Sequence, residues 1–447
     1  MSLRRHVKTL DETRKRKVDN ASPESSGPRA TRQTFARFFF NDGHRGCTPH
    51  SRRRAHSERV RPVAREMTSS DVPADDTPFT CRWGFLSCGK IAHDFATALG
   101  TVDSTHAKIR HVVQACASAS ASRASAFGEA HGVPARYRHD SHESFLSCPD
   151  TLQQCDIVHV SSLNHQHRDQ VLALIAAGKN VLCEKPMGMN LLEVEEMQRA
   201  ADAAGVFLGE GMWTRFFPAV KHVKELIRSN AIGEVVSAHC DFSFASTPLD
   251  SPRLWFVDLG GGGLLDVGCY VLAMVDMCFR AGGYNVVQSA KSSASAIVKE
   301  GVDVAGGALL AYEKEKEKGD GTEIREALAT CAWGIAARGE ETCFVAGTKG
   351  SIKIVSPMHC PDTVVVTDAS GASVTKTFAL PPAVKTDAYH YRNSRGLIYE
   401  ADAAAECLRR GDREFREFDW DDSRRLVRRM DDIRDRVGVK YPEKKRT

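Results

Sequence analysis

The sequence predicts an α/β protein that begins with a doubly wound parallel sheet and continues into an α+β domain with a mostly antiparallel open sheet. From Phe79 to Glu210, short apolar runs alternate with stretches whose apolar residues recur at helical spacing, as in consecutive βαβ units. After Asn285, strand-like runs follow one another with turn residues between them. At 447 residues the chain is long enough for two ordinary domains.

Residues 1–78 do not have the composition of a folded domain. Positions 1–70 hold 17 Lys/Arg and 7 Asp/Glu, a net charge of +10, which leaves −6 on the rest of a chain whose total is +4. Low hydrophobicity with high net charge predicts a disordered basic extension. Runs such as Arg14–Lys17 are commonly just solvated, although nuclear-localisation and nucleic-acid-binding segments also contain them. The acidic residues argue against a transit peptide, and Met67 offers a second start for translation.

The overall composition is that of a soluble globular protein, with 42% hydrophobic and 26% charged residues. No apolar run approaches the roughly 18 residues of a membrane span, so we expect no transmembrane helix. The 14 cysteines are scattered, without Cys-x-x-Cys pairs or zinc-ligand spacing, which favours buried thiols in a reducing compartment. We expect a cytoplasmic protein without a metal site; the basic extension leaves nuclear or organellar targeting open.

The first βα unit carries a candidate nucleotide-binding turn. After the apolar strand Trp83–Ser87, the residues Ser87, Gly89 and Ala92 fit a Gly-x-Gly-x-x-Gly/Ala turn with serine in the first glycine's place. Gly89 lets the backbone approach a pyrophosphate, and the helix that opens at Lys90 and Ile91 offers N–H groups to the phosphates. Strand–glycine–helix turns are common, so the motif gains its weight from standing at the head of a βαβ series.

The second strand, Ile109–Ala117, precedes the stretch where an acidic residue would bind an NAD ribose. Residues 117–123 contain no acid. Hydroxyls at Ser118 and Ser120 and the guanidinium of Arg123 suit a 2′-phosphate instead, so NADP is favoured over NAD. The alternative is that Ser122 caps the next helix while Arg123 faces solvent.

Further strands and helices complete the parallel sheet. We expect helices at Ala126–His131, His167–Ala177 and Asn190–Ala204, the last with an Asn190/Glu193 capping box, and strands at Cys155–Val160, Val181–Lys185 and Val206–Glu210. The loop after the first of these strands supplies further candidate cofactor contacts, namely Ser161, Asn164 and His167. Histidines are also metal ligands, but nothing in this loop completes a set.

The strand Val181–Cys183 ends in Glu184 and Lys185, and Pro186 stops it at once. A lysine at the carboxyl end of a buried parallel strand points into the crevice where such folds bind ligands. Desolvation and a nearby positive charge favour neutral lysine, a usable proton acceptor, so we expect activity to rise toward alkaline pH. An isolated Glu-Lys-Pro is more often a surface lysine beside a turn; the surrounding βαβ pattern reverses that reading.

The second half opens with Trp213–Pro218 and an amphipathic helix, followed by the strand Val235–Phe244. Glycines 260–263 then begin a helix with Asp266 and Tyr270 at i and i+4, on one face. A carboxylate and a phenol so placed can orient a substrate hydroxyl and exchange protons with it. The alternative is a core helix with Tyr270 packed inside.

The rest of this half predicts a sheet and two closing helices. The expected strands are Val286–Val298, Val304–Tyr312, Ala327–Ala336, Thr342–Ala346, Ser351–Val355, Thr363–Thr367 and Ser373–Leu380. The expected helices are Glu400–Arg410 and Asp421–Val437. We place domain limits at 79–205 and 206–420, with a helix and tail at 421–447.

Together these motifs resemble the Gfo/Idh/MocA oxidoreductases, and within them the branch of dimeric dihydrodiol dehydrogenases and NADP-dependent D-xylose 1-dehydrogenases. The resemblance runs from about Arg82 to Pro442. It rests on four motifs in order: Arg82-Trp83-Gly84 with Ser87-Cys88-Gly89, Val181 to Gly188, Trp213 to Pro218, and Gly262 to Tyr270.

The resemblance implies an N-terminal Rossmann domain, hydride transfer between a sugar or diol carbon and nicotinamide, and a homodimer through the C-terminal sheet. Lys185, Asp266 and Tyr270 match the family's catalytic residues. Trp213, Phe216 and Arg253 resemble substrate contacts, together with Asp266 and Tyr270. Glu184, Lys185, Trp213 and Arg215 resemble cofactor contacts.

Two rival functions stay open at this point. The same fold serves NADP-sensing regulators, which need no proton relay, and the basic extension would fit nuclear residence. An oxidoreductase of an inositol or an amino sugar is the other. We expect a small-molecule substrate, no membrane partner and no nucleic-acid partner.

Overall fold

The computed structural model describes residues 78–101, 108–286, 292–314, 326–382 and 389–442. The predicted basic extension lies outside them, apart from its last residue. Within the described part, two sheets with their helices form one compact unit.

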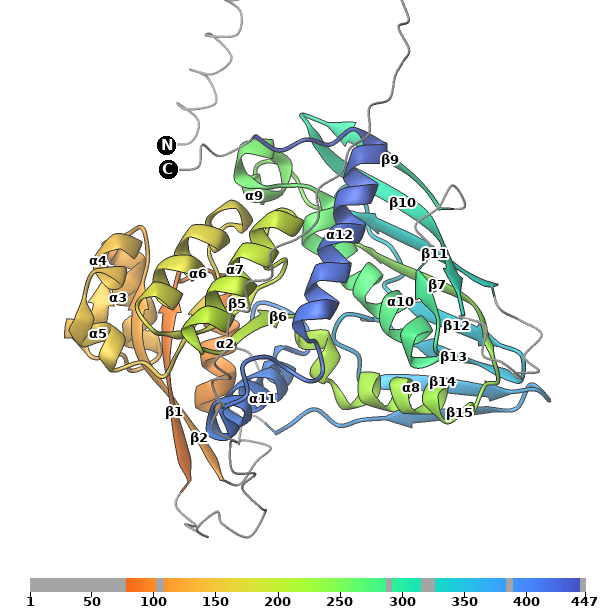
Figure 1. Cartoon of the computed structure of the whole chain (residues 1–447), viewed down its shortest axis with the longest axis horizontal. Helices are drawn as coiled ribbons and strands as arrows, with labels where there is room; N and C mark the ends of the chain where they lie inside the picture. Colours follow the sequence, from red (N-terminus) through yellow and green to blue (C-terminus); the bar gives the residue numbers. More distant parts are fainter. Residues whose placement is uncertain (1–77, 102–107, 287–291, 315–325, 383–388, 443–447) are drawn as a thin grey trace, which may run out of the picture. The chain divides into compact units, whose positions relative to one another are not determined.

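The first sheet is parallel throughout, in the order β3-β2-β1-β4-β5-β6 (Figure 1). Its strands are β1 (Phe79–Leu86), β2 (Ile109–Ala117), β3 (Arg138–His139), β4 (Ile157–Val160), β5 (Asn180–Glu184) and β6 (Leu208–Gly211). The direction of strand order reverses at β1 and β4, and a doubly wound sheet binds its ligand at the carboxyl ends beside that reversal. The predicted Rossmann architecture is confirmed.

Helices cover this sheet. They are α2 (Lys90–Thr101), α3 (Ala121–Ala130), α4 (His142–Leu146), α5 (Pro149–Gln153), α6 (His167–Ala176) and α7 (Leu191–Ala204). Figure 1 shows α6 and α7 side by side. The side chain of Asn190 caps α7 by accepting from the Glu193 N–H at 3.0 Å, as the capping pattern predicts.

Helix α3 begins five residues before the predicted start. Ser120, not Ser122, is its N-cap residue, and Ser122 lies in the first turn. Alanine is the best helix former, so an Ala/Ser segment without large apolar residues can be helical while showing little periodicity.

The second sheet runs β15-β14-β13-β12-β7-β11-β10-β8, with β9 paired to β10. Its strands are β7 (Val235–Ser243), β8 (Asn285–Val286), β9 (Ser293–Lys299), β10 (Val302–Glu313), β11 (Glu326–Gly334), β12 (Cys343–Gly347), β13 (Gly350–Ile354), β14 (Thr363–Asp368) and β15 (Ser373–Thr377). Among the described strands of this second sheet, only β7 and β11 pair in parallel, so the mostly antiparallel prediction holds. The predicted strand Val286–Val298 is wrong as a single element, since β8 and β9 are separate partners of β10.

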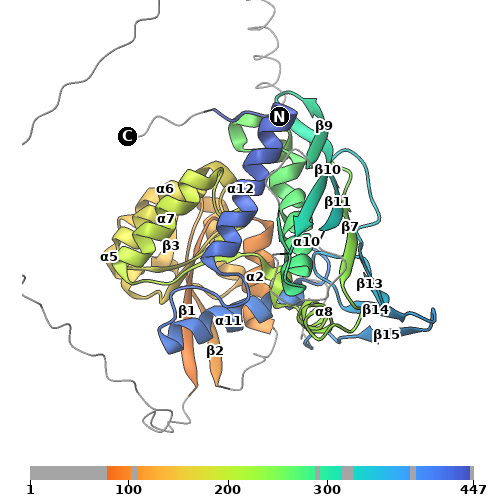
Figure 2. The same cartoon turned by 45° about the vertical axis from the view of Figure 1, so that its right-hand side comes forward.

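Helices α8 (Pro218–Arg228), α10 (Cys269–Ala281) and α12 (Trp420–Val437) lie along one side of this sheet (Figure 2). The stretch Val257–Ala281 is long and apolar enough to cross a membrane by length and composition, with a mean hydropathy of 1.5 over its most apolar window. That window is 94% buried inside the protein, as expected for a core helix.

The end of the chain returns to the first sheet, so the predicted domain limits need revision. Strand β6 pairs with β5 although it lies beyond residue 205, and α11 (Leu397–Arg410) packs on α2. The buried Asp94 of α2 binds the segment that precedes α11. Its carboxylate accepts hydrogen bonds from the His390 N–H at 2.8 Å, the Tyr391 N–H at 2.9 Å and the Ser394 hydroxyl at 2.6 Å.

A second buried contact joins α11 to the sheet. The Trp83 indole N–H donates to His111 Nδ1 at 3.0 Å, which leaves the proton of a neutral imidazole on Nε2. That nitrogen lies 2.9 Å from Asp402 of α11. The three polar groups therefore satisfy one another inside the core.

Candidate active site

The β1–α2 turn has the conformation expected of a dinucleotide turn. Ser87, in the first glycine's place, adopts φ 101°, and its N–H bonds the Ala117 carbonyl at 3.0 Å. A β-carbon added to Gly89 would meet no atom within 4 Å, so the space beside this backbone is open. Helix α2 starts at Lys90, and Ala92 is fully buried beneath it. Open space over unpaired helix N–H groups fits a pyrophosphate.

The predicted ribose contacts lie beyond the end of β2, beside this turn. Ser118 is buried, with its N–H on the His139 carbonyl at 3.1 Å, and the hydroxyl of Ser120 lies 3.0 Å from that of Ser122. Arg123 is exposed. Arg123 lies close enough to affect Cys88, a residue of the turn. The pKa of Cys88 is raised by its hydrogen bond with Cys116 and by burial, and the positive charge of Arg123 partly lowers it.

The loop after β4 contains three predicted cofactor contacts, of which Ser161 bonds to the dinucleotide turn while Asn164 and His167 bond to neighbouring loops. The Ser161 hydroxyl donates to the Ser87 carbonyl at 3.4 Å. The Asn164 amide donates to the Gly260 carbonyl at 3.1 Å, joining this loop to the glycine segment before Asp266. His167 is 1% exposed, and its ring nitrogens lie 3.0 Å from the Pro186 carbonyl and 3.2 Å from the Ser162 carbonyl. Through Pro186 it therefore contacts the loop that follows Lys185. The predicted direct contact of His167 with the cofactor does not fit this burial.

Lys185 meets the second half of the chain at the carboxyl end of β5. Its ammonium nitrogen lies 2.7 Å from the backbone carbonyl oxygen of Asp266 and 3.9 Å from Asp266 Oδ1. The same nitrogen lies 4.6 Å from the centre of the Tyr270 ring. Residues that lie 81 and 85 positions apart in sequence thus converge on one point, as the motif reading predicts.

Asp266 is held in its charged form by two cations. Its Oδ1 lies 2.7 Å from Arg253 Nη1. Burial alone would raise the pKa of Asp266, but the charges of Arg253 and Lys185 and the Arg253 hydrogen bond outweigh it, so the pKa is lowered. Asp266 lies in a π-helical turn, Leu264–Gly268, that leads into α10; such turns are frequent at functional sites.

Tyr270 is a buried phenol with one defined partner. The Trp213 indole N–H donates to its hydroxyl oxygen at 2.9 Å, which leaves the phenol O–H available as a donor. Burial and the carboxylate of Glu184 raise the pKa of Tyr270 well above its ordinary value. The predicted face shared by Asp266 and Tyr270 is present, because both groups lie beside Lys185.

Three predicted contacts lie away from this cluster. Phe216 is 1% exposed and packs against Phe415, with ring centres 4.7 Å apart, so it is a core residue and not a pocket wall. Arg215 pairs with Asp422 of α12 at 3.5 Å and does not face the turn. Glu184 is buried with its Oε1 3.4 Å from His159 Nε2, behind the strand end.

The structure adds two residues that the sequence pattern did not indicate. His359 stacks on Phe242 at 4.2 Å and lies 5.6 Å from the Tyr270 ring; burial, then Lys185 and Arg392, lower its pKa to about 3, so it is neutral. Tyr391 lies near Arg253 and Asp266: burial raises its pKa, Arg253 acts to lower it and Asp266 acts to raise it. Neither residue stands in a motif, and each is brought here by a return of the chain. Within the described ranges, no group of His, Cys, Asp or Glu has the arrangement of a metal site.

Two family models match consecutive parts of the chain: an oxidoreductase family with an NAD-binding Rossmann fold over residues 81–212, and the Gfo/Idh/MocA C-terminal domain over residues 220–353. The chain belongs to the Gfo/Idh/MocA oxidoreductase family. The trans-1,2-dihydrobenzene-1,2-diol dehydrogenases of Danio rerio and Mus musculus are 34% and 33% identical to it, over 81% and 82% of this chain and 98% and 99% of theirs.

Solved structures share the fold of this family member at lower identity. An aldose-aldose oxidoreductase from Caulobacter crescentus, complexed with glycerol, matches with a TM-score of 0.65 and 23% identity, over 80% of this chain and 98% of its own. A 3-ketoreductase from Actinomadura kijaniata, complexed with NADP, has a TM-score of 0.61 and 21% identity over 80% and 98%. An inositol dehydrogenase homolog from Azotobacter vinelandii, complexed with NAD⁺, has a TM-score of 0.64 and 17% identity over 81% and 96%.

Proposed function

We propose that this oxidoreductase is an NADP-dependent dehydrogenase that oxidises a CH–OH group of a trans-dihydrodiol or of a sugar such as D-xylose. The names of the relatives at 33–34% identity support the diol, and the sugar enzymes among the structural neighbours support a polyol. The observation that carries the proposal is the convergence of Lys185, Asp266 and Tyr270 at the carboxyl end of β5, on the sheet edge that also carries the dinucleotide turn.

The three groups divide the proton chemistry between them. Bound nicotinamide supplies the hydride acceptor for the substrate carbon. Lys185, once it has released its own proton, accepts the substrate's hydroxyl proton, and the Asp266 carboxylate, 3.9 Å from its nitrogen, stabilises the ammonium that forms. Tyr270 stays protonated because burial raises its pKa, so its O–H donates to the substrate oxygen while its lone pair accepts from Trp213.

NADP is the proposed cofactor because the ribose side of the turn has hydroxyls and a cation but no carboxylate between residues 117 and 123. Arg123 is exposed, and a guanidinium forms a bidentate pair with a phosphate. Ser118 and Ser120 are the candidate hydroxyl partners.

The substrate side combines aromatic rings with one cation. Trp213, Tyr270 and His359 present ring surfaces around Lys185, while Arg253 is partly exposed, with 43% of its side chain accessible. An aromatic wall suits either a cyclohexadiene diol or the carbon face of a pyranose. Arg253 is the group available to a second hydroxyl.

A homodimer through the second sheet is part of the proposal. Ile297, Leu309, Leu328 and Phe344 stand on β9, β10, β11 and β12, with exposed fractions of 60%, 37%, 47% and 38%. Strand β7 lies between β11 and β12, and the strand register puts the four side chains on the same face. An apolar face of this kind is characteristic of an interface, and a second copy of the sheet is complementary to it.

The test is NADPH formation at 340 nm with NADP or NAD, using D-xylose, D-glucose and a trans-dihydrodiol as substrates. Lys185→Met should lower kcat by about 10²–10⁴-fold while cofactor binding, followed by fluorescence, is unchanged. Lys221→Met, at a half-exposed lysine of α8, is the matched control and should keep full activity.

Cofactor binding without turnover of any diol, sugar or polyol would overturn the enzyme assignment and favour the NADP-sensing regulator. Equal turnover by the Lys185→Met variant would overturn the role given to Lys185.

A further inference from the structure

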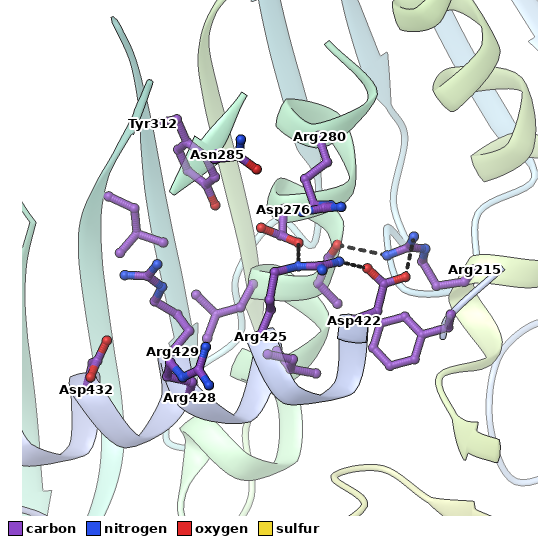
Figure 3. Close-up of a pocket in the computed structure, with 15 residues that line it drawn as sticks. Arg215, Asp276, Arg280, Asn285, Tyr312, Asp422, Arg425, Arg428, Arg429 and Asp432 are labelled. Atoms are coloured by element: carbon purple, nitrogen blue, oxygen red, sulfur yellow. Dashed lines mark hydrogen bonds and ion pairs between the residues drawn. The ribbon is translucent and has the colours of Figure 1, made fainter. Parts of the chain in front are cut away.

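A cavity of about 250 Å³ lies between α10 and α12, apart from the Lys185 cluster (Figure 3). Its walls come from α10, α12, β8 and β10, with Phe418 and one residue of the Trp213–Phe216 turn at the end. Side chains of Leu272, Leu310 and Leu426 line it together with the phenol of Tyr312. Nothing in the proposed dehydrogenase chemistry uses this cavity.

The cavity is lined by more cations than anions. Its arginines are Arg215, Arg280, Arg425, Arg428 and Arg429, and its carboxylates are Asp276, Asp422 and Asp432. The lining therefore carries a net charge of +2 at neutral pH. Guanidinium groups keep their charge when partly buried, so this excess is present at every physiological pH.

Two of the five arginines are already neutralised. Arg215 Nη2 lies 3.5 Å from Asp422 Oδ2, and Arg425 Nε lies 3.5 Å from Asp276 Oδ2. Arg425 also contacts Asp422, so the four side chains form one chain of alternating charges, drawn by the dashed lines in Figure 3. This network fixes α12 against α10 and needs no ligand.

The other three arginines have no such partner. Across the part of the chain that the structure describes, Arg280, Arg428 and Arg429 make no ion pair with a carboxylate within 4.0 Å. Arg280 acts electrostatically on Arg425 and Asp422 from α10, and Arg429 acts on the buried Tyr312 from α12. Arg280 therefore lines the cavity from α10, and Arg429 lines it from α12.

We infer that this cavity is a binding site for a small, multiply charged anion carrying phosphate groups. A guanidinium without a carboxylate partner can form two parallel hydrogen bonds to a phosphate, and two neighbouring helices each supply one here. The amide of Asn285 and the hydroxyl of Tyr312 add neutral hydrogen-bonding groups. The leucine side chains make part of the lining apolar, and a less polar surrounding strengthens a charge-assisted hydrogen bond.

The site adjoins the catalytic segments without containing their reactive groups. Helix α10 carries Tyr270 in its first turn and Arg280 in its last. Arg215 stands two residues after Trp213, the donor to the Tyr270 hydroxyl. An anion between Arg280 and Arg429 would therefore bear on the helix that positions Tyr270.

The experiment is titration of the full chain with pyrophosphate by calorimetry, at constant ionic strength and in saturating NADP. Saturation with NADP occupies the dinucleotide turn, which is itself a phosphate site, so only a second site can give heat. Arg280→Gln/Arg429→Gln leaves the Arg215–Asp422–Arg425–Asp276 network in place. Arg410→Gln, at a surface arginine of α11 paired with Asp412, is the matched control.

We expect one equivalent of pyrophosphate to bind in saturating NADP, with affinity at least about tenfold weaker in the double variant and unchanged in Arg410→Gln. Absence of heat in the presence of NADP overturns the proposal, as does binding that the double variant retains. A folded double variant, checked by circular dichroism and by dehydrogenase activity without pyrophosphate, separates loss of the site from loss of the fold.

Discussion

The ammonium of Lys185 lies 2.7 Å from the backbone carbonyl oxygen of Asp266, closer than the 3.9 Å to that residue's carboxylate. The backbone contact orients the lysine, while the carboxylate is taken up by Arg253 at 2.7 Å. Asp266 therefore serves the site twice: its main chain positions the proton acceptor, and its side chain holds a negative charge beside it. Replacing the side chain removes only the second of these effects.

Arg253→Gln should raise the pKa of the Asp266 carboxyl group. Arg253 lowers this pKa and burial raises it, so removing the guanidinium lets burial dominate. The rise should be about 1–3 pH units. It is measured on the carboxyl group itself, by NMR of isotope-labelled aspartate, because Lys185 is the proton acceptor and its own deprotonation enters the kcat/KM profile. Arg253→Lys keeps a cation and should raise the pKa less. An Asp266 pKa that does not move in Arg253→Gln would contradict the role of this pair.

Arg123→Ala should weaken discrimination between the two nicotinamide cofactors. A guanidinium that contacts the 2′-phosphate contributes only to NADP binding, so the ratio of kcat/KM for NADP over NAD should fall by about 10–100-fold. Ser122→Ala is the control, since Ser122 lies in the first turn of α3 with its hydroxyl on Ser120. If both variants keep the wild-type ratio, the 2′-phosphate is bound elsewhere.

Phe344→Glu should convert the proposed dimer into a monomer. Phe344 stands on β12 in the exposed apolar face of the second sheet, where a carboxylate would be desolvated on association. Light scattering after gel filtration measures the mass directly. Leu192→Glu, at a 60% exposed leucine of α7, makes the same chemical change on another surface and should leave the mass unchanged. A wild-type monomer at micromolar concentration would refute the dimer.

Phe216→Ala should act on stability and not on substrate affinity. Phe216 is buried against Phe415, so truncation leaves a cavity, and the free energy of unfolding should fall by about 3–5 kcal/mol. Urea denaturation measures this loss. At urea concentrations below the new unfolding midpoint, KM for the substrate should stay near the wild-type value. A large rise in KM would show instead that Phe216 contacts the substrate.

Much of the fold follows from patterns local to the sequence. Strand β2 is predicted at the bounds that the structure has, and the Asn190 cap defines the start of α7, because both depend on neighbouring residues only. The convergence of Lys185 with Asp266 and Tyr270 was available from the family motifs, since each stands in a characteristic segment.

The direction in which each side chain points could not be predicted from such local patterns. Trp213, Arg215 and Phe216 occupy one 3-10 turn, yet Trp213 faces Tyr270, Arg215 faces α12 and Phe216 faces the core. Consecutive residues in a tight turn point in different directions, and only tertiary packing decides which of them meets a ligand. His359 and Tyr391 were missed for a related reason: long-range returns of the chain bring them to the site.

The hydrogen bonds between Asp94 and residues 390–394 have a consequence for synthesis of the protein. Asp94 lies in the first described helix, but the groups that satisfy its buried carboxylate come from residues 390–394. Until that segment has left the ribosome, the nascent chain holds an unpaired charge beneath its nucleotide turn, and His111 still lacks Asp402. The dinucleotide half therefore reaches its final packing only when almost the whole chain is made, and a product ending before residue 389 should be a substrate for proteolysis.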